Sequence, residues 1–88
     1  MSVFRFEVVV GLKEGLADPA GRAIGDALPA LGWTNVHGVH VGRSIVLALD
    51  APSAVEAEAQ IAEMADRFLT NPVIERYQVR ALAGEDAL

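Results

Sequence analysis

The sequence predicts an α+β fold whose elements follow the order β-α-β-β-α-β. Three observations support this order: apolar residues alternate along residues 3–11, a helical apolar stripe runs through residues 19–31, and a capping box from Ser53 to Glu56 opens a second helix. Two right-handed βαβ crossovers joined by a hairpin form a four-stranded antiparallel sheet with both helices on one face. We therefore expect a ferredoxin-like βαββαβ sandwich.

The first and last strands lie near the two ends of the sequence. The first runs from Val3 to about Gly11, with Phe and Val side chains on one face and Arg5 and Glu7 on the other. The last runs from about residue 73 to residue 82. We expect one domain over residues 1–82, followed by an acidic tail at residues 83–88 that frays.

The first helix is expected from Pro19 to about Leu31. Asp18 is a good N-cap, and Pro19 suits the first helical position because an N–H there would have no partner. Gly32 can close the helix in the left-handed conformation. Pro29 lies near the end of the helix and removes one hydrogen bond, so we expect a kink or a slackened last turn.

A tight hairpin is expected in the middle of the chain. Residues 33–41 and 44–50 are typical of two strands, and Gly42-Arg43 is typical of the tip of a type II′ turn between them. The open face of the resulting sheet should carry a mixed set of side chains with an apolar centre. A sheet face of this kind usually finds a partner.

The second helix should run to about Leu69. Pro72 restricts Asn71 to extended backbone, so the helix must stop by Thr70. Asn71 is expected to hydrogen-bond the last carbonyls of the helix, which have no partner within it. This local role explains Asn71-Pro72 without a partner, just as capping explains Asp18-Pro19.

The composition excludes several classes of function. The chain has 88 residues and a net charge of −5, and its basic residues are scattered, which argues against binding nucleic acid or an anionic membrane surface. It has no cysteine, which excludes disulfides, thiolate metal sites and a cysteine nucleophile and fits a cytoplasmic protein. Neither a signal peptide nor a membrane-spanning run of about 18 apolar residues is visible.

A 52% hydrophobic content is high for a lone small domain, so we expect a homodimer or a higher homo-oligomer.

The residues themselves predict no catalytic, cofactor or metal site. His37 and His40 are three apart on an expected strand, so their side chains point to opposite faces and do not share one metal. The loop at residues 11–15 precedes a helix N-terminus but lacks both GxxxxGK[ST] and GxGxxG. The acidic residues of the second helix are typical of a solvated face.

Four short motifs in their order along the chain resemble the PurS family, the small subunit of bacterial phosphoribosylformylglycinamidine (FGAM) synthase. They are Asp18-Pro19-Ala20-Gly21, Leu31-Gly32-Trp33, Gly42-Arg43 and Asn71-Pro72-Val73-Ile74-Glu75-Arg76-Tyr77. The family commonly has Gln in place of Ala20, Tyr in place of Trp33 and Lys in place of Arg43. Pro29 is not part of the family pattern.

This resemblance implies a non-catalytic subunit in the fourth step of purine biosynthesis. There formylglycinamide ribonucleotide, glutamine and ATP yield formylglycinamidine ribonucleotide. A glutaminase subunit releases ammonia, a large synthetase subunit uses it, and the small subunit bridges the two and assists ammonia transfer. The resemblance implies ATP and Mg²⁺ in the synthetase and no cofactor in this chain. Candidate partner contacts, led by the charges of Lys13 and Arg43, are Lys13, Asp18, Arg43, Asn71, Pro72 and Glu75.

Other functions remain open because this fold hosts many activities. A regulatory domain that binds a small molecule at a dimer interface is the main alternative, and stabilisation by a panel of amino acids would favour it. An acylphosphatase-like enzyme would need a paired Arg and Asn beside the first loop, which supplies only Lys13. An RNA-recognition module is disfavoured by the acidic charge and the lack of exposed sheet aromatics.

Overall fold

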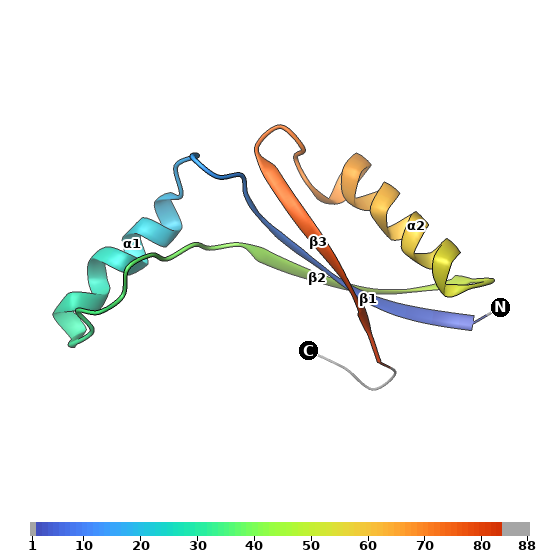
Figure 1. Cartoon of the computed structure of the whole chain (residues 1–88), viewed down its shortest axis with the longest axis horizontal. Coiled ribbons are helices and arrows are strands. Elements are labelled where there is room, and N and C mark those ends of the chain that lie inside the picture. Colours follow the sequence, from blue (N-terminus) through green and yellow to red (C-terminus); the bar gives the residue numbers. More distant parts are fainter. Residues whose placement is uncertain (1, 84–88) are drawn as a thin grey trace.

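The computed structural model describes residues 2–83, which form three strands and two helices (Figure 1). The elements are β1 (Ser2–Leu12), α1 (Pro19–Ala27), a 3₁₀ turn η1 (Leu28–Leu31), β2 (Arg43–Ala51), α2 (Ala54–Met64), a π-helical turn η2 (Ala65–Leu69) and β3 (Glu75–Leu82). The expected tail lies outside the described residues except for Ala83. No helix within residues 2–83 combines the length and apolar character needed to span a bilayer.

The sheet is antiparallel, with the first strand at its centre. The strand order is β2-β1-β3, and Phe6 lies opposite Leu47 of β2 and Ala81 of β3. Alternate residues of β1 point to the two faces, and α2 covers only one of them. The core between α2 and the sheet consists of Phe6, Val8, Val10, Ala51, Ala57, Ile61 and Ala65.

Helix α2 begins and ends with side-chain hydrogen bonds. The Ser53 hydroxyl accepts from the backbone N–H of Glu56, as the capping box predicts. At the other end, the backbone N–H and the hydroxyl of buried Thr70 both donate to the carbonyl of Ala65. The last helical turn is a π turn, so this carbonyl is satisfied five residues along the chain.

Helix α1 projects away from the sheet together with the segment that follows it (Figure 1). We call residues 19–42 the arm. The expected N-cap at Asp18 and the left-handed Gly32, with a φ of 105°, are both confirmed. The α-helix ends at Ala27 and continues as a 3₁₀ turn that contains Pro29, so the slackened last turn is also confirmed.

Two expectations about the arm are wrong. Both helices were expected on one face of the sheet. Instead, α1 packs beside residues 39–41 of its own arm, and α2 alone covers that face. A strand was expected over residues 33–41 with a hairpin tip at Gly42-Arg43, but within residues 2–83 this segment forms no strand and the sheet has three. The reason is geometric: a segment that follows α1 away from the sheet cannot reach the edge of β2.

The arm makes the molecule elongated. Its radius of gyration is 16.5 Å and its dimensions are 53 × 31 × 14 Å. A compact domain of this length has a radius of gyration of about 12 Å. The strand β2 therefore keeps one unpaired edge, and much of the apolar surface of the arm is exposed: Leu31 and Trp33 are 68% and 55% exposed.

Candidate functional site

The family-like motifs meet where the arm joins the sheet. Asp18 ties the two sides of the arm together: its Oδ1 accepts from the N–H of Gly21 at 2.9 Å and its Oδ2 from the N–H of Val41 at 2.9 Å. The Nδ1 of His40 lies 3.7 Å from Oδ2. These contacts, the Gly21 and Val41 N–H groups above all, hold the pKa of Asp18 below its usual value.

Two glycines at this junction are required by close backbone contacts. A Cβ on Gly21 would overlap the carbonyl oxygen of Val39, and a Cβ on Gly42 would overlap the carbonyl oxygen of Val10. Neither glycine has a positive φ, so the requirement is for space and not for conformation. The motifs around Gly21 and Gly42 are therefore explained by how closely the chain packs at the root of the arm.

A second cluster lies where β2 and β3 begin. Arg43 donates to Glu75 through Nη1 at 2.6 Å and through Nη2 at 3.1 Å, and Nη2 also donates to the carbonyl of Leu69 at 2.7 Å. Glu75 Oε1 accepts in addition from the N–H of Asn71 at 2.7 Å. Bonding to Arg43 first, and to Asn71 second, lowers the pKa of Glu75, and the same pair raises the pKa of Arg43.

A surface depression of about 540 Å³ lies between these clusters. The ends of the arm, of β1 and of β3 surround it, and its charged lining residues are Lys13, Glu14, Asp18, His40 and Arg76. Within residues 2–83, no group of three or more His, Asp or Glu side chains could hold a metal ion. Every buried side-chain nitrogen or oxygen of this part of the chain has a hydrogen-bond partner.

The candidate contact residues therefore separate into two groups. One group makes hydrogen bonds to other residues of the same chain and consists of Asp18, Arg43, Asn71 and Glu75. In contrast, the side chains of Lys13 and Pro72 are exposed. The hydrogen bonds of Lys13 are made by its backbone: its N–H donates to the carbonyl of Ile74, and its carbonyl accepts from the N–H of Leu16.

Two detailed expectations about these residues need correction. Arg43 is the first residue of β2 and no hairpin tip, and its charge is paired with Glu75. Asn71 does not cap the last carbonyls of the helix; its Oδ1 accepts from the N–H of Val73 at 3.1 Å and forms a turn. Thr70 takes the capping role because its hydroxyl lies one residue nearer to the helix.

The sequence reasoning missed a polar connection across the sheet. Glu7 accepts from Ser44 on β2 and from Arg80 on β3, which joins all three strands on the face away from α2. The available signal was the opposite charge of Glu7 and Arg80 at positions on the same predicted face. Their pairing depends on a register that the sequence does not define.

Comparison with known proteins decides the family. The family described as PurS, phosphoribosylformylglycinamidine (FGAM) synthase, matches residues 5–83. The chain belongs to the PurS family. It is 42% identical over 73 residues to the phosphoribosylformylglycinamidine synthase subunit PurS of Archaeoglobus fulgidus, covering 83% of this chain and 91% of that relative. It is 31% identical over 85 residues to the subunit of the same name in Bacillus subtilis, covering 94% and 100% of the two chains.

Solved structures of the family match this chain over more than nine tenths of its length. A chain of the structure of PurLQS from Thermotoga maritima matches with a TM-score of 0.87 and 30% identity over 93% of this chain and 100% of that one. The crystal structure of PurS from Methanocaldococcus jannaschii matches with a TM-score of 0.81 and 30% identity, covering 93% and 99%. These coverages confirm the family resemblance along nearly the full chain.

Proposed function

We propose that this chain, a PurS-family subunit of FGAM synthase, performs no chemistry itself and holds the glutaminase and synthetase subunits together during purine biosynthesis. The observation that carries the proposal is the match of a chain of the PurLQS structure to 93% of this chain. The site supports it, since hydrogen bonds tie the family motifs together at the root of the arm and at the start of β2 and β3.

The proposed role of the scaffold is to assist ammonia transfer. Ammonia released by the glutaminase is protonated in bulk water and is then no longer a nucleophile. A subunit that keeps the two active sites in one closed assembly shortens that exposure. ATP and Mg²⁺ bind to the synthetase, this chain binds no cofactor, and the complex works in the cytoplasm.

Reconstitution tests this function. The glutaminase and synthetase subunits of the same organism are assayed with and without this chain, using glutamine or free ammonia as the nitrogen source. We expect this chain to be required with glutamine and dispensable with a high concentration of ammonia. Full glutamine-dependent activity without it would refute the proposal, as would tight binding of ATP to the isolated chain.

We also propose that the chain acts as a homodimer in which each arm completes the sheet of the other copy. A fourth strand was expected at the unpaired edge of β2, and α1 was expected on the sheet face beside α2, but the chain's own arm occupies neither place. An arm from a second copy supplies both elements and restores the four-stranded ferredoxin-like arrangement. Such an exchange is reciprocal and closes with two-fold symmetry.

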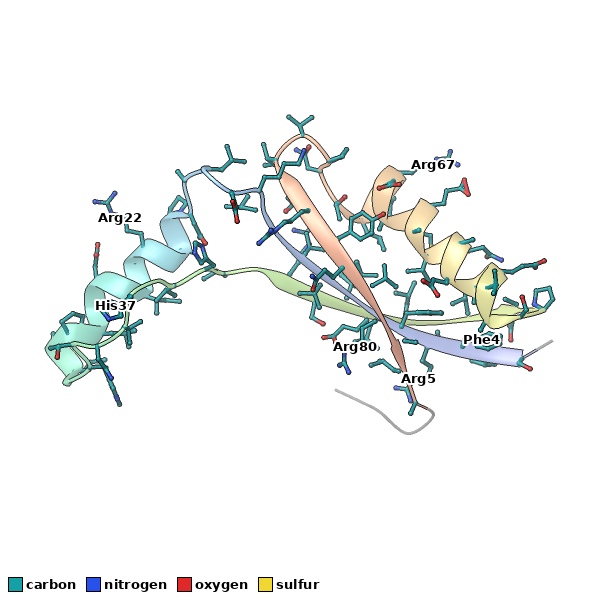
Figure 2. The ribbon with its side chains drawn as sticks, in the orientation of Figure 1. Phe4, Arg5, Arg22, His37, Arg67 and Arg80 are labelled. Atoms are coloured by element: carbon teal, nitrogen blue, oxygen red, sulfur yellow. The ribbon has the colours of Figure 1, made fainter. Side chains whose placement is uncertain are left out.

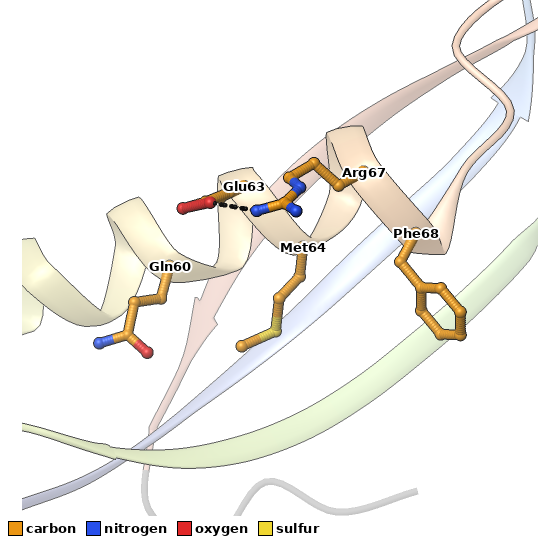
Figure 3. Close-up of a pocket in the computed structure, with 5 residues that line it drawn as sticks. All are labelled: Gln60, Glu63, Met64, Arg67 and Phe68. Carbon is orange, nitrogen blue, oxygen red and sulfur yellow. Dashed lines mark hydrogen bonds and ion pairs between the residues drawn. The ribbon is translucent and has the colours of Figure 1, made fainter.

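The helix α2 offers a surface that fits this exchange. A groove of about 430 Å³ is lined by Gln60, Glu63, Met64, Arg67 and Phe68 (Figure 3). Figure 3 shows Gln60, Met64 and Phe68 on the same side of the helix, at the four-residue spacing of one helix face. Phe68 is 86% exposed, which is unusual for a phenylalanine. A helix from a second copy packed in the groove would bury this side chain.

Light scattering tests the dimer. The wild-type chain should have about twice the 9.3 kDa mass of one copy. Phe68→Glu should shift the chain toward one copy, because it places a charge in the proposed contact. Val55→Glu is the matched control, since Val55 is 79% exposed on α2 but does not line the groove. A wild-type mass of one copy, or equal effects of the two variants, would contradict the arrangement.

A further inference from the structure

The sheet face opposite α2 is open and faces solvent in the described chain. By the strand register it carries Val3, Arg5, Glu7 and Val9 from β1, Ser44, Val46, Ala48 and Asp50 from β2, and Arg76, Gln78, Arg80 and Leu82 from β3. Figure 2 shows Arg5 and Arg80 on this side, away from α2. We call this surface the open face. It is separate from the edge of β2 and from the groove on α2.

The open face is positive in a chain whose net charge is −5. Three arginines lie on it against two carboxylates, Glu7 and Asp50. The acidic side chains concentrate elsewhere, with Glu56, Glu58, Glu63 and Asp66 along α2 and its last turn. The charge is therefore divided between the two sides of the molecule, and the open face is suited to a partner that presents carboxylates.

Arg80 lies on the edge strand β3 and is held by hydrogen bonds to Glu7 on the central strand. Its Nε and Nη2 both donate to Glu7 Oε1, at 3.0 and 2.7 Å, and the other oxygen of Glu7 accepts from the Ser44 hydroxyl at 2.5 Å. The Glu7 side chain is only 18% exposed, whereas that of Arg80 is 65% exposed. Within the described residues, Nη1 of Arg80 has no acceptor, so this edge of the guanidinium remains available.

A fixed arginine is a favourable anchor for an interface. A flexible arginine loses side-chain entropy when it binds, but the contacts to Glu7 have already removed much of that freedom. Arginine is also among the residues that contribute most to binding energy at protein interfaces. Val9 on β1 and Val46 and Ala48 on β2 supply apolar contact area on the same face.

The charge of the open face argues against a second copy of this chain as its occupant. A two-fold contact between two open faces would bring two surfaces of the same net positive charge together. A contact between the open face of one copy and the acidic side of α2 of another would be heterologous, so it would build rings or open chains of copies and not the two-fold dimer proposed above. A different protein with an acidic surface avoids both problems.

We propose that the open face, with Arg80 of β3 as its anchor, docks a carboxylate-bearing surface of another subunit of the FGAM synthase complex. The inference rests on the proposed function, which requires such a subunit to bind. The carboxylate of the partner bonds to Nη1 of Arg80, while Glu7 continues to hold the other side of the guanidinium.

Binding measurements on purified subunits test this assignment. Arg80→Gln removes the anchor, and Gln78→Glu adds an anion to the same face without touching the contact between Arg80 and Glu7. Each should weaken binding to the partner subunit about tenfold or more, as expected for a lost charged hydrogen bond. Arg22→Gln is the control, because it removes an equal charge from an exposed position on α1 and should leave the affinity within about twofold. Arg80→Gln should also make the affinity less dependent on salt.

The outcomes separate this inference from the proposed function. If the wild-type chain binds its partner subunits and neither Arg80→Gln nor Gln78→Glu changes the affinity, the open face is not the docking surface and the proposed function stands. If the wild-type chain binds no other subunit, the proposed function fails and this inference fails with it. If Arg80→Gln instead lowers the mass of the chain alone in light scattering, the open face binds a second copy and the inference is wrong.

Discussion

Replacing Gly21 by alanine tests the packing at the root of the arm. Alanine is the better helix former by about 0.8–1.0 kcal/mol, so helix propensity alone predicts a more stable protein. The added Cβ, however, would overlap the backbone carbonyl of Val39 and would lie 2.8 Å from the Oδ2 atom of Asp18. Backbone cannot rotate away as a flexible side chain can, so α1 and residues 39–41 must separate.

The two effects have opposite signs, and the structure decides which is larger. Forcing an extra carbon into a packed site costs about 1–3 kcal/mol. Separation of α1 from Val41 also weakens the hydrogen bond between the Val41 N–H and Asp18. After the gain in propensity, we expect Gly21→Ala to lower the free energy of unfolding by about 1–2 kcal/mol. In a domain of this size, that lowers Tm by about 4–16 °C.

Gly25→Ala provides the matched control on the same helix. Its Cβ would lie 3.6 Å from Cγ2 of Val39, which is an ordinary van der Waals contact. We expect Gly25→Ala to keep or raise stability, by up to about 1 kcal/mol. Urea and thermal unfolding should be compared at one protein concentration, since stability depends on concentration in an oligomer. If Gly21→Ala is as stable as Gly25→Ala, the close contact at the root of the arm is refuted.

Three further predictions concern the end of α2 and the titrating groups. Asn71→Ala should cost about 1 kcal/mol in urea unfolding through the lost turn hydrogen bond; full stability together with lost partner binding would make Asn71 an interface contact instead. Tyr77 is the single tyrosine, and burial and its bond to Asp66 raise its pKa, so ultraviolet titration of its phenolate should have a midpoint above 10.0 that falls in Asp66→Asn. An unchanged midpoint in that variant would contradict the contact. The pKa values of Asp18 and Glu75 are lowered in the folded chain, so their contribution to stability is present at neutral pH and is lost as the pH falls below about 4. Acid unfolding of Glu75→Gln should therefore show a weaker pH dependence than that of the wild-type chain.

Local features of the fold could be predicted from the sequence because short segments determine them. Asp18, Ser53 and Gly32 have the predicted capping roles, and the proline in η1 has the predicted effect on the end of the first helix. Each of these depends on contacts within a few residues. The alternation along β1 likewise identified the buried Phe6, Val8 and Val10.

The position of the arm could not be predicted in the same way. The apolar stripe of α1 could pack on the sheet of its own chain or on that of a second copy. The sequence pattern shows that one face of the helix is apolar, but it does not show which surface covers that face. The strand predicted at residues 33–41 failed for the same reason, since a strand needs a neighbouring edge. The pairing of Arg43 with Glu75 joins positions 32 residues apart, beyond the reach of local patterns.

β1 is both the first element of the described chain and the central strand of the sheet. Its partner β3 is the last element of the described chain, and Arg5 lies opposite Leu82 in the register. Contacts between residues so distant in sequence form late and slowly. During translation, the side of β1 that pairs with β3 therefore stays uncovered until residues 75–82 have been made. Any surface that depends on all three strands forms only after that point.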